Sequence, residues 1–310
     1  MTLSPRDEAR GLALVALSTV AYGVLPIFGK VAYAAGVAAL PLLAWRYAIA
    51  AVLIALTARG PRLPLRERAP LWAIGSIFVF NSIAYFRALE QIPASVTALV
   101  LYTYPVMVAL LAAAAGVERL TARGLVASVA AFAGCALTAG GAPAGRPLPA
   151  SGIGWALLAA LIYASYIVLS GRFGRGVPAR VLALHLAQVA AVVCIALALA
   201  GPGLRLPAEP RAWASVAAIG IVSTVVAMTA FLAGMALVGP TRASVLSSLE
   251  VIVTLILAAA LLGERLAPMQ WAGAALILGA VAFQNAPALR RALSAGAGQH
   301  TIAPRPERPR

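Results

Sequence analysis

An acidic side chain inside a long apolar stretch is the feature of this sequence that most clearly indicates chemistry. The stretch from Ser244 to Leu266, SVLSSLEVIVTLILAAALLGERL, has Glu250 near its middle. A carboxylate at the centre of a spanning helix costs about 2.5–3.5 kcal/mol to insert, so it usually faces a protein interior or a watery cavity. Ser247, Glu250 and Thr254 are spaced i, i+3 and i+7 and share one helix face. We expect Glu250 and Ser247 to line a cavity, where the carboxylate binds a substrate ammonium or a coupling proton; the alternative is a structural hydrogen-bonding group between helices.

Tyr104 and Pro105 lie in a second apolar stretch, at the depth that we expect for Glu250. Proline cannot donate a hydrogen bond to the carbonyl of Leu101, so it frees that carbonyl and bends the helix. Transporters use bent or broken helices to expose backbone groups to a substrate. The sequence therefore predicts a bent, cavity-lining helix here, and the alternative is a packing kink without substrate contact. Pro26 predicts a similar bend in the first apolar stretch.

Two basic side chains also fall inside apolar stretches, at Arg46 and His185. Arg46 is the more costly of the two to insert, and three interpretations stay open for it. It can bind a substrate carboxylate, pair with a carboxylate of the protein, or extend to the outer interface. His185 and Gln188 form an i, i+3 polar pair, which is more typical of a helix–helix hydrogen bond than of a proton relay.

The composition identifies the elements that must position these groups. The chain has 310 residues, of which 62% are hydrophobic and 11% charged, with a mean hydropathy of +0.94. A soluble domain of this size cannot bury so much apolar surface, so we expect an all-α integral membrane protein. The net charge of +15 does not indicate nucleic acid, because the basic residues lie between apolar runs and in the tails. Ten spans are predicted, at 11–34, 39–58, 70–90, 93–115, 122–142, 151–171, 178–201, 212–235, 240–262 and 268–286.

The distribution of basic residues predicts the orientation. With the N-terminus inside, seventeen Lys and Arg residues fall on the cytoplasmic side and six on the opposite side. The excess places both termini in the cytoplasm. Residues 287–310 are then a cytoplasmic Pro/Arg-rich tail, which can contact anionic lipid.

The two halves of the chain show a faint internal repeat. Glu118-Arg119-Leu120 and Glu264-Arg265-Leu266 close the fourth and ninth spans, 146 residues apart, and the same offset pairs Tyr104 with Glu250. Five spans in each half is an odd number, so the second half enters the membrane from the opposite face. The pattern predicts two inverted five-helix repeats, at 11–142 and 151–286, with a site near the midplane between them.

The stretches Ala88–Thr121 and Gly239–Leu266 resemble the two EamA domains of the drug/metabolite transporter superfamily. The most specific parts are Ser-Leu-Glu at 248–250 and the two Glu-Arg-Leu closures. The resemblance implies ten helices in two inverted repeats, and export of amino acids or other small metabolites across the bacterial inner membrane. Many relatives have Trp-Gly in the first span, where this chain has Tyr22-Gly23, while Lys30 stands at the usual later position.

The resemblance also implies that the third, fourth, sixth and ninth spans line the cavity. Two polar or aromatic pairs share a face of the third and of the sixth span, and we expect them to complete the site; the alternative for each residue is packing or an interfacial anchor. They are Asn81 with Tyr85, and Tyr163 with Tyr166.

Other function classes lack the residues they need. The chain has one aspartate and two histidines, no His-Glu-x-x-His or Gly-x-Ser-x-Gly motif, and no glycine-rich phosphate loop. We therefore expect no enzyme, no cofactor and no metal. The expected function is secondary-active export of a small molecule by alternating access, coupled to protons. The alternatives are an uncoupled facilitator and a multidrug or organic-cation exporter; oligomeric state is open.

Overall fold

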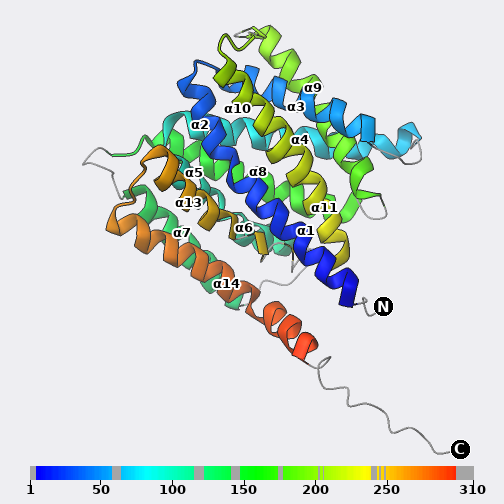
Figure 1. Cartoon of the computed structure of the whole chain (residues 1–310). Coiled ribbons are helices and arrows are strands. Elements are labelled where there is room, and N and C mark those ends of the chain that lie inside the picture. Colours follow the sequence, from blue (N-terminus) through cyan, green and yellow to red (C-terminus); the bar gives the residue numbers. More distant parts are fainter. Residues whose placement is uncertain are drawn as a thin grey trace, which may run out of the picture.

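The regular secondary structure of the described residues is helical, and short turns and irregular segments join the helices (Figure 1). The computed structural model describes residues 5–57, 64–114, 122–140, 147–173, 177–201, 203–204, 206–238, 243, 246–247 and 249–297. The helices in chain order are α1 (Pro5–Gly23), α2 (Leu25–Ala34), α3 (Ala39–Thr57), α4 (Leu65–Gln91), α5 (Ala94–Leu101), α6 (Tyr104–Ala114), α7 (Ala122–Gly140), α8 (Ala150–Phe173), α9 (Ala179–Ala200), α10 (Pro210–Gly220), the π-helical turn η2 (Ile221–Val226), α11 (Ala227–Val238), α13 (Leu249–Leu262) and α14 (Pro268–Ala297).

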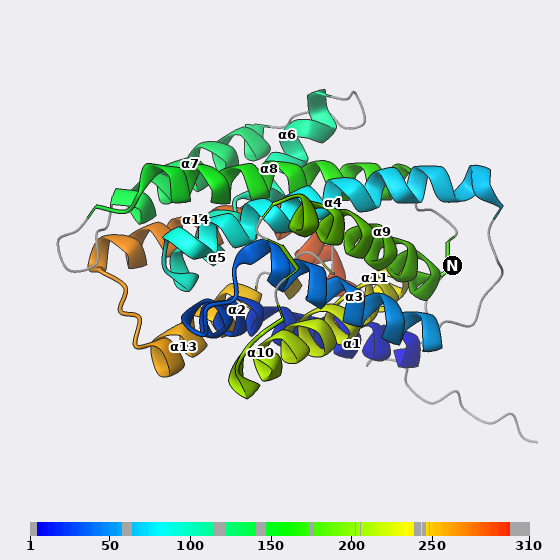
Figure 2. The same cartoon turned by 90° about the horizontal axis from the view of Figure 1, so that it is seen from above.

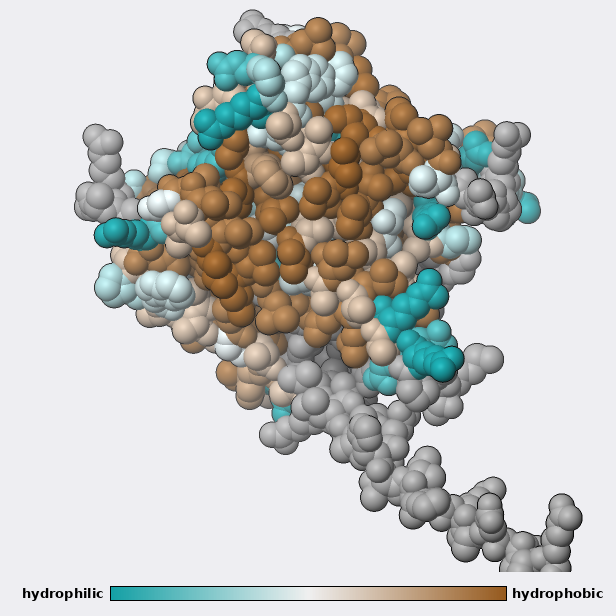
Figure 3. Space-filling view, in the orientation of Figure 1, coloured by the Kyte–Doolittle hydropathy of each residue, from teal (hydrophilic) through white to brown (hydrophobic). Residues whose placement is uncertain are grey.

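Length and composition make this a multi-pass membrane protein. Within the described residues, six helical segments are long and apolar enough to cross a bilayer, and four shorter apolar helices accompany them. Large apolar side chains such as Val129, Ile256 and Leu261 are more than 60% exposed. Figure 3 shows apolar residues covering most of the visible face, with polar groups gathered at its edges. A surface of this kind is suited to lipid rather than to water.

The helices pack in pairs that join distant parts of the chain. α1 lies along α11, α3 along α9, α4 along α8, and α7 along α14. Figures 1 and 2 show the last pair at one side of the bundle, with the other three pairs beside it. Each pair combines a helix from before residue 141 with one from after residue 149, so the two halves interleave.

Two of the predicted spans are interrupted, as their prolines indicate. The first span is not one helix over 11–34: α1 ends at Gly23 and α2 begins at Leu25, with Pro26 in its first turn. The fourth span breaks after Leu101, and α6 resumes at Tyr104. Pro105 lacks the N–H that would continue the hydrogen-bond ladder at this point. Each of these prolines therefore lies within two residues of an interruption in its predicted span.

Two other features correct the sequence-based boundaries. The span predicted at 212–235 contains the π-helical turn η2, for which hydropathy carries no signal. At the other end, α14 continues to Ala297 instead of stopping at 286, so the first residues of the predicted tail are helical. Residues 298–310, and the Glu118-Arg119-Leu120 closure, lie outside the described residues.

Carboxylates at two helix ends cap the starts of other helices. Glu264 accepts hydrogen bonds from the backbone N–H of Ala94 (2.8 Å) and of Ser95 (3.0 Å), and from the Ser95 hydroxyl (2.6 Å). Glu90 accepts one from the N–H of Ala39 (3.1 Å) and pairs with Arg87. The first N–H groups of a helix have no partner within it, and its dipole favours a negative charge there.

Replacing Glu264 by Ala is expected to destabilise the fold, because two backbone donors at the start of α5 lose their acceptor. Hydrogen bonds to charged groups contribute about 1.5–3 kcal/mol. The fraction of protein that stays monodisperse after heating in detergent should fall for Glu264→Ala, and fall less for Ser95→Ala. Arg265→Ala, at the exposed neighbouring position, is the control. If all three variants kept the same monodisperse fraction after heating, the hydrogen bonds of Glu264 to α5 would contribute nothing to stability.

Candidate functional site

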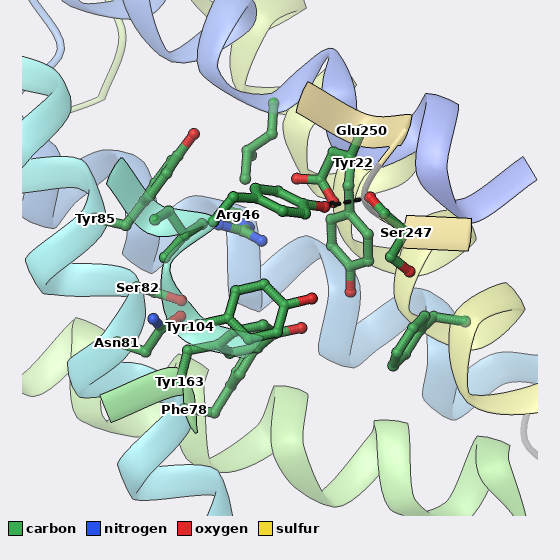
Figure 4. A pocket seen from close by; sticks show the side chains of 14 residues that line it. Tyr22, Arg46, Phe78, Asn81, Ser82, Tyr85, Tyr104, Tyr163, Ser247 and Glu250 are labelled. Carbon is green, nitrogen blue, oxygen red and sulfur yellow. Dashed lines mark hydrogen bonds between the residues drawn. The ribbon is translucent and has the colours of Figure 1, made fainter. Parts of the chain in front are cut away.

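A cavity opens within the bundle and collects side chains from both halves of the chain (Figure 4). Including its open mouth, it encloses about 660 Å³ of space that protein atoms do not fill. Its lining residues are Tyr22, Leu25, Arg46, Phe78, Asn81, Ser82, Tyr85, Leu101, Tyr102, Tyr104, Tyr163, Phe231, Ser247 and Glu250.

Glu250 lies in the first turn of α13 and reaches the cavity beside the break in the fourth span. The Tyr102 hydroxyl shares its single proton between Glu250 Oε2 (2.9 Å) and the carbonyl oxygen of Ser247. Tyr102 occupies the interruption between α5 and α6, where the chain leaves helical geometry. The break therefore places one hydroxyl against both the acid and the backbone that precedes it.

A close contact with the first span fixes the position of α13. Thr254 donates its hydroxyl to the carbonyl oxygen of Gly23 (3.0 Å). A Cβ on Gly23 would lie 2.6 Å from Val253 Cγ1, so only glycine lets the two segments approach this closely. Thr254 shares the helix face of Glu250 as predicted, but its hydroxyl serves this contact and it is absent from the cavity lining.

Arg46 is buried and faces the cavity. Its side chain is 2% exposed, and its Nε donates to Thr224 Oγ1 (2.7 Å). The guanidinium carbon lies 4.8 Å from the ring centre of Tyr47 and 5.7 Å from that of Phe86. The interpretation in which Arg46 extends to the interface is therefore wrong. No carboxylate of the described residues forms an ion pair with it, and this leaves the substrate interpretation open.

Aromatic rings and an amide form the remaining wall. The Tyr104 ring lies 4.7 Å from that of Tyr163 in an edge-to-face arrangement, and Tyr163 stacks on Tyr166 at 5.7 Å. Asn81 donates its side-chain amide to the carbonyl oxygen of Ala159 (2.8 Å), which ties α4 to α8. The ring faces carry negative charge density that attracts cations.

Most of the predicted site residues meet in this cavity. The residues that line it are Glu250, Ser247, Tyr104, Asn81, Tyr85, Tyr163 and Arg46.

Three predicted residues are not placed in the cavity lining. Tyr166 packs behind it, against Tyr163 and Phe78. His185 is buried in α9, and its Nδ1 lies 2.8 Å from the carbonyl oxygen of Val181, one turn earlier in its own helix. For Pro105 the backbone is described but the side chain lies outside the described residues. Neither Tyr166 nor His185 is among the residues that line this cavity, because helix periodicity does not fix how a helix is rotated.

Sequence reasoning missed several lining residues, above all Tyr102. The 146-residue offset pairs Glu250 with Tyr104, but the helix break shifts the contact to Tyr102. Phe78, Ser82 and Tyr85 are spaced i, i+4 and i+7, so the face of α4 that contains Asn81 and Tyr85 could have indicated the first two. Within the described residues, no group of three metal-binding side chains lies together.

Comparisons with known proteins agree with this architecture. A model of the EamA-like transporter family matches residues 9–140 and 150–286. A protein of Bacillus subtilis (strain 168), named as the uncharacterized transporter YcbK, is 28% identical over 282 residues, which are 86% of this chain and 90% of that protein. A solved crystal structure, titled only as that of a protein, matches with a TM-score of 0.67 at 23% identity and covers 92% of this chain and 99% of its own. That identity indicates the fold alone. The family match confirms the resemblance found in the sequence.

Proposed function

Since this chain belongs to the EamA-like transporter family, we propose that it exports small metabolites, amino acids or related compounds, by proton-coupled alternating access. The chain is a multi-pass membrane transporter and not an enzyme. The proposal adds a substrate class, a direction and a coupling ion. It also places the protein in the bacterial inner membrane, with ten spanning helices and both termini in the cytoplasm.

One observation carries the proposal: a single cavity contains a carboxylate, a guanidinium and several rings, contributed by both family-matched segments. Arg46 and Tyr104 come from the first segment, and Tyr163 and Glu250 from the second. An amino acid with an apolar side chain has one group of each charge beside that side chain, so it matches this lining. Rocking of the two segments against each other would open such a site to one face and then to the other.

A pair of matching helix contacts supports two inverted repeats, over 11–142 and 151–286. Gly11, near the start of the first segment, lies against the end of α11, and its Cβ would be 2.5 Å from Val238 Cγ1. Gly152, near the start of the second, lies against the end of α4, and its Cβ would be 2.5 Å from Ile92 Cγ2. Val238 and Ile92 are themselves 146 residues apart. The first helix of each segment thus contacts the third helix of the other in the same way.

The proposed proton coupling rests on the chemistry of one carboxylate. A proton and a substrate ammonium both neutralise Glu250, so the two are expected to compete for it. Exchange of one for the other across the membrane is antiport. The Tyr102 hydroxyl supplies a hydrogen bond to Glu250 while neither the proton nor the substrate ammonium is bound.

The test is uptake into proteoliposomes of a labelled panel of amino acids, organic cations and neutral metabolites, with and without an imposed pH gradient. Accumulation of one class only with the gradient supports coupled antiport. A substrate flux that is the same with and without the pH gradient supports the uncoupled facilitator.

An organic-cation exporter is the second candidate, and the ring-lined wall favours it. The rings of Tyr104 and Tyr163, with Glu250 opposite, could hold a cation without any anionic group. The panel separates the two candidates, because a cation exporter would carry amines or quaternary ammonium compounds and reject amino acids.

Replacing Tyr102 by Phe is expected to lower the initial transport rate about tenfold without abolishing transport. The change removes one hydroxyl that bonds Glu250 and the Ser247 carbonyl, while the ring keeps its packing. Tyr104→Phe is the matched comparison, because the Tyr104 hydroxyl has no hydrogen bond within the described residues, and we expect it to retain most of the rate. Equal losses in the two variants would contradict a specific role for the Tyr102 hydroxyl.

A further inference from the structure

We infer that Thr224, placed by its π-helical turn, orients Arg46 as the anion-binding group of the cavity, so that the site selects cargo with a carboxylate over its decarboxylated counterpart. This inference rests on the proposed transport function. It assigns Thr224 a positioning role, since it acts through Arg46 and is absent from the cavity lining.

The Thr224 hydroxyl donates one hydrogen bond and accepts another, from partners on different sides. It donates to the carbonyl oxygen of Ile219 (2.9 Å), and it accepts from Arg46 Nε (2.7 Å). A hydroxyl has one donor proton, so donation to Ile219 turns a lone pair toward the guanidinium. Thr224 is 1% exposed, so water does not compete for either bond.

The π-helical turn produces this direction. Several other serine and threonine hydroxyls in the helices bond to the carbonyl oxygen four residues earlier, as Thr19 does to Val15 and Thr138 to Gly134. Thr224 bonds five residues earlier instead. One π turn inserts an extra residue and rotates the side chains that follow, and such turns are frequent at functional sites.

A glycine brings the turn close to the helix that contains Arg46. Gly220 directly precedes η2, and a Cβ there would lie 3.0 Å from Ile49 Cγ2 and 3.3 Å from the backbone oxygen of Arg46. α3 and η2 therefore approach almost to backbone contact. At this separation the short side chain of Thr224 reaches Nε directly.

Fixing Nε leaves the terminal nitrogens of Arg46 for a ligand. Within the described part of the chain they have no hydrogen-bond partner, and Figure 4 shows the guanidinium directed into the cavity. The rings of Tyr47 and Phe86 further restrict its plane. A guanidinium held by Nε presents two parallel N–H donors, which is the geometry that binds a carboxylate in a bidentate manner. Glu250 supplies the opposite charge in the same cavity.

The experiment compares pairs of compounds that differ only in a carboxylate: L-leucine with 3-methylbutylamine, and L-phenylalanine with 2-phenylethylamine. KM and kcat are measured in proteoliposomes for wild type, Thr224→Val, Thr224→Ser and Arg46→Lys. Ser223→Ala is the matched control, because the buried Ser223 hydroxyl lies in the same π turn and has no partner within the described residues. Size-exclusion profiles establish that each variant folds.

The expected result is a rise of about tenfold in KM for the amino acids in Thr224→Val and Arg46→Lys, with kcat within about twofold and the amines unaffected. Thr224→Ser should restore the wild-type KM, and Ser223→Ala should match wild type. Arg46→Lys tests the inference independently if Thr224→Val does not fold, because lysine keeps the charge and loses Nε.

Several results would overturn the inference. The first is a KM for the amino acids that does not change in Thr224→Val or Arg46→Lys. The second is a variant that loses transport of the amino acid and of its amine equally. The third is a wild-type protein that transports the amines but not the corresponding amino acids. In the last case transport itself stands and only the anion site fails. If wild type moves no compound of these pairs or of the wider panel, the proposed function fails together with the inference.

Discussion

Replacing Glu250 by Gln is expected to abolish gradient-driven accumulation of cargo while leaving the folded protein intact. Glutamine keeps the shape of the side chain and can still accept the Tyr102 hydrogen bond, but it cannot take up a proton or neutralise an ammonium. The measurement is accumulation in proteoliposomes with an imposed pH gradient, at a protein content matched by quantitative immunoblot.

Glu67→Gln provides the control, because Glu67 is an exposed acid in the first turn of α4 and lies away from the cavity lining. We expect this variant to accumulate cargo as wild type does. Near-normal accumulation by well-folded Glu250→Gln would instead make Glu250 a structural hydrogen-bonding group, which is the alternative that the sequence left open.

The second large effect is expected from Gly273→Ala, which should prevent α14 from packing on α7. A Cβ on Gly273 would lie 2.4 Å from Thr138 Oγ1, 2.6 Å from the carbonyl oxygen of Gly134 and 2.8 Å from the backbone N of Thr138. Two of these atoms belong to the backbone, so the helices themselves must separate. Overpacking in well-packed cores typically costs about 1–3 kcal/mol, and rigid backbone places this variant at the upper end. Thermal unfolding in detergent, followed by size exclusion, measures the loss.

Gly279→Ala tests whether the effect is steric. Gly279 lies on the same helix, and nothing is within 4 Å of its Cβ position. Alanine is favoured over glycine in helices by about 1 kcal/mol, so this variant should be as stable as wild type or slightly more. If Gly273→Ala unfolded at the same temperature as Gly279→Ala, that result would contradict the close packing of α14 on α7.

Sequence reasoning succeeded where the cause is local. Pro26 and Pro105 break their helices because a proline ring removes a hydrogen bond within one turn, whatever packs around it. Glu250 had to face a cavity or a polar partner, because an unpaired carboxylate in lipid is too costly. In the structure it has both.

Sequence reasoning failed where helix rotation decides the outcome. Tyr163 and Tyr166 share one face of α8, yet only Tyr163 lines the cavity, since a face is wider than the opening it meets. Arg46 stayed ambiguous for the same reason, because depth alone cannot distinguish a buried partner from the interface.

The sequence by itself determined the class of protein, its family and the need of Glu250 for a polar environment, because apolar run length, short motifs and the cost of burying charge are properties of short stretches. The tertiary structure alone decided which groups meet. Tyr102 bonds Glu250 across 148 residues, Arg46 bonds Thr224 across 178, and Glu264 caps α5 across 170. Such pairings depend on the rotation, depth and spacing of whole helices, which many weak packing contacts set together, and no local pattern in the chain encodes them.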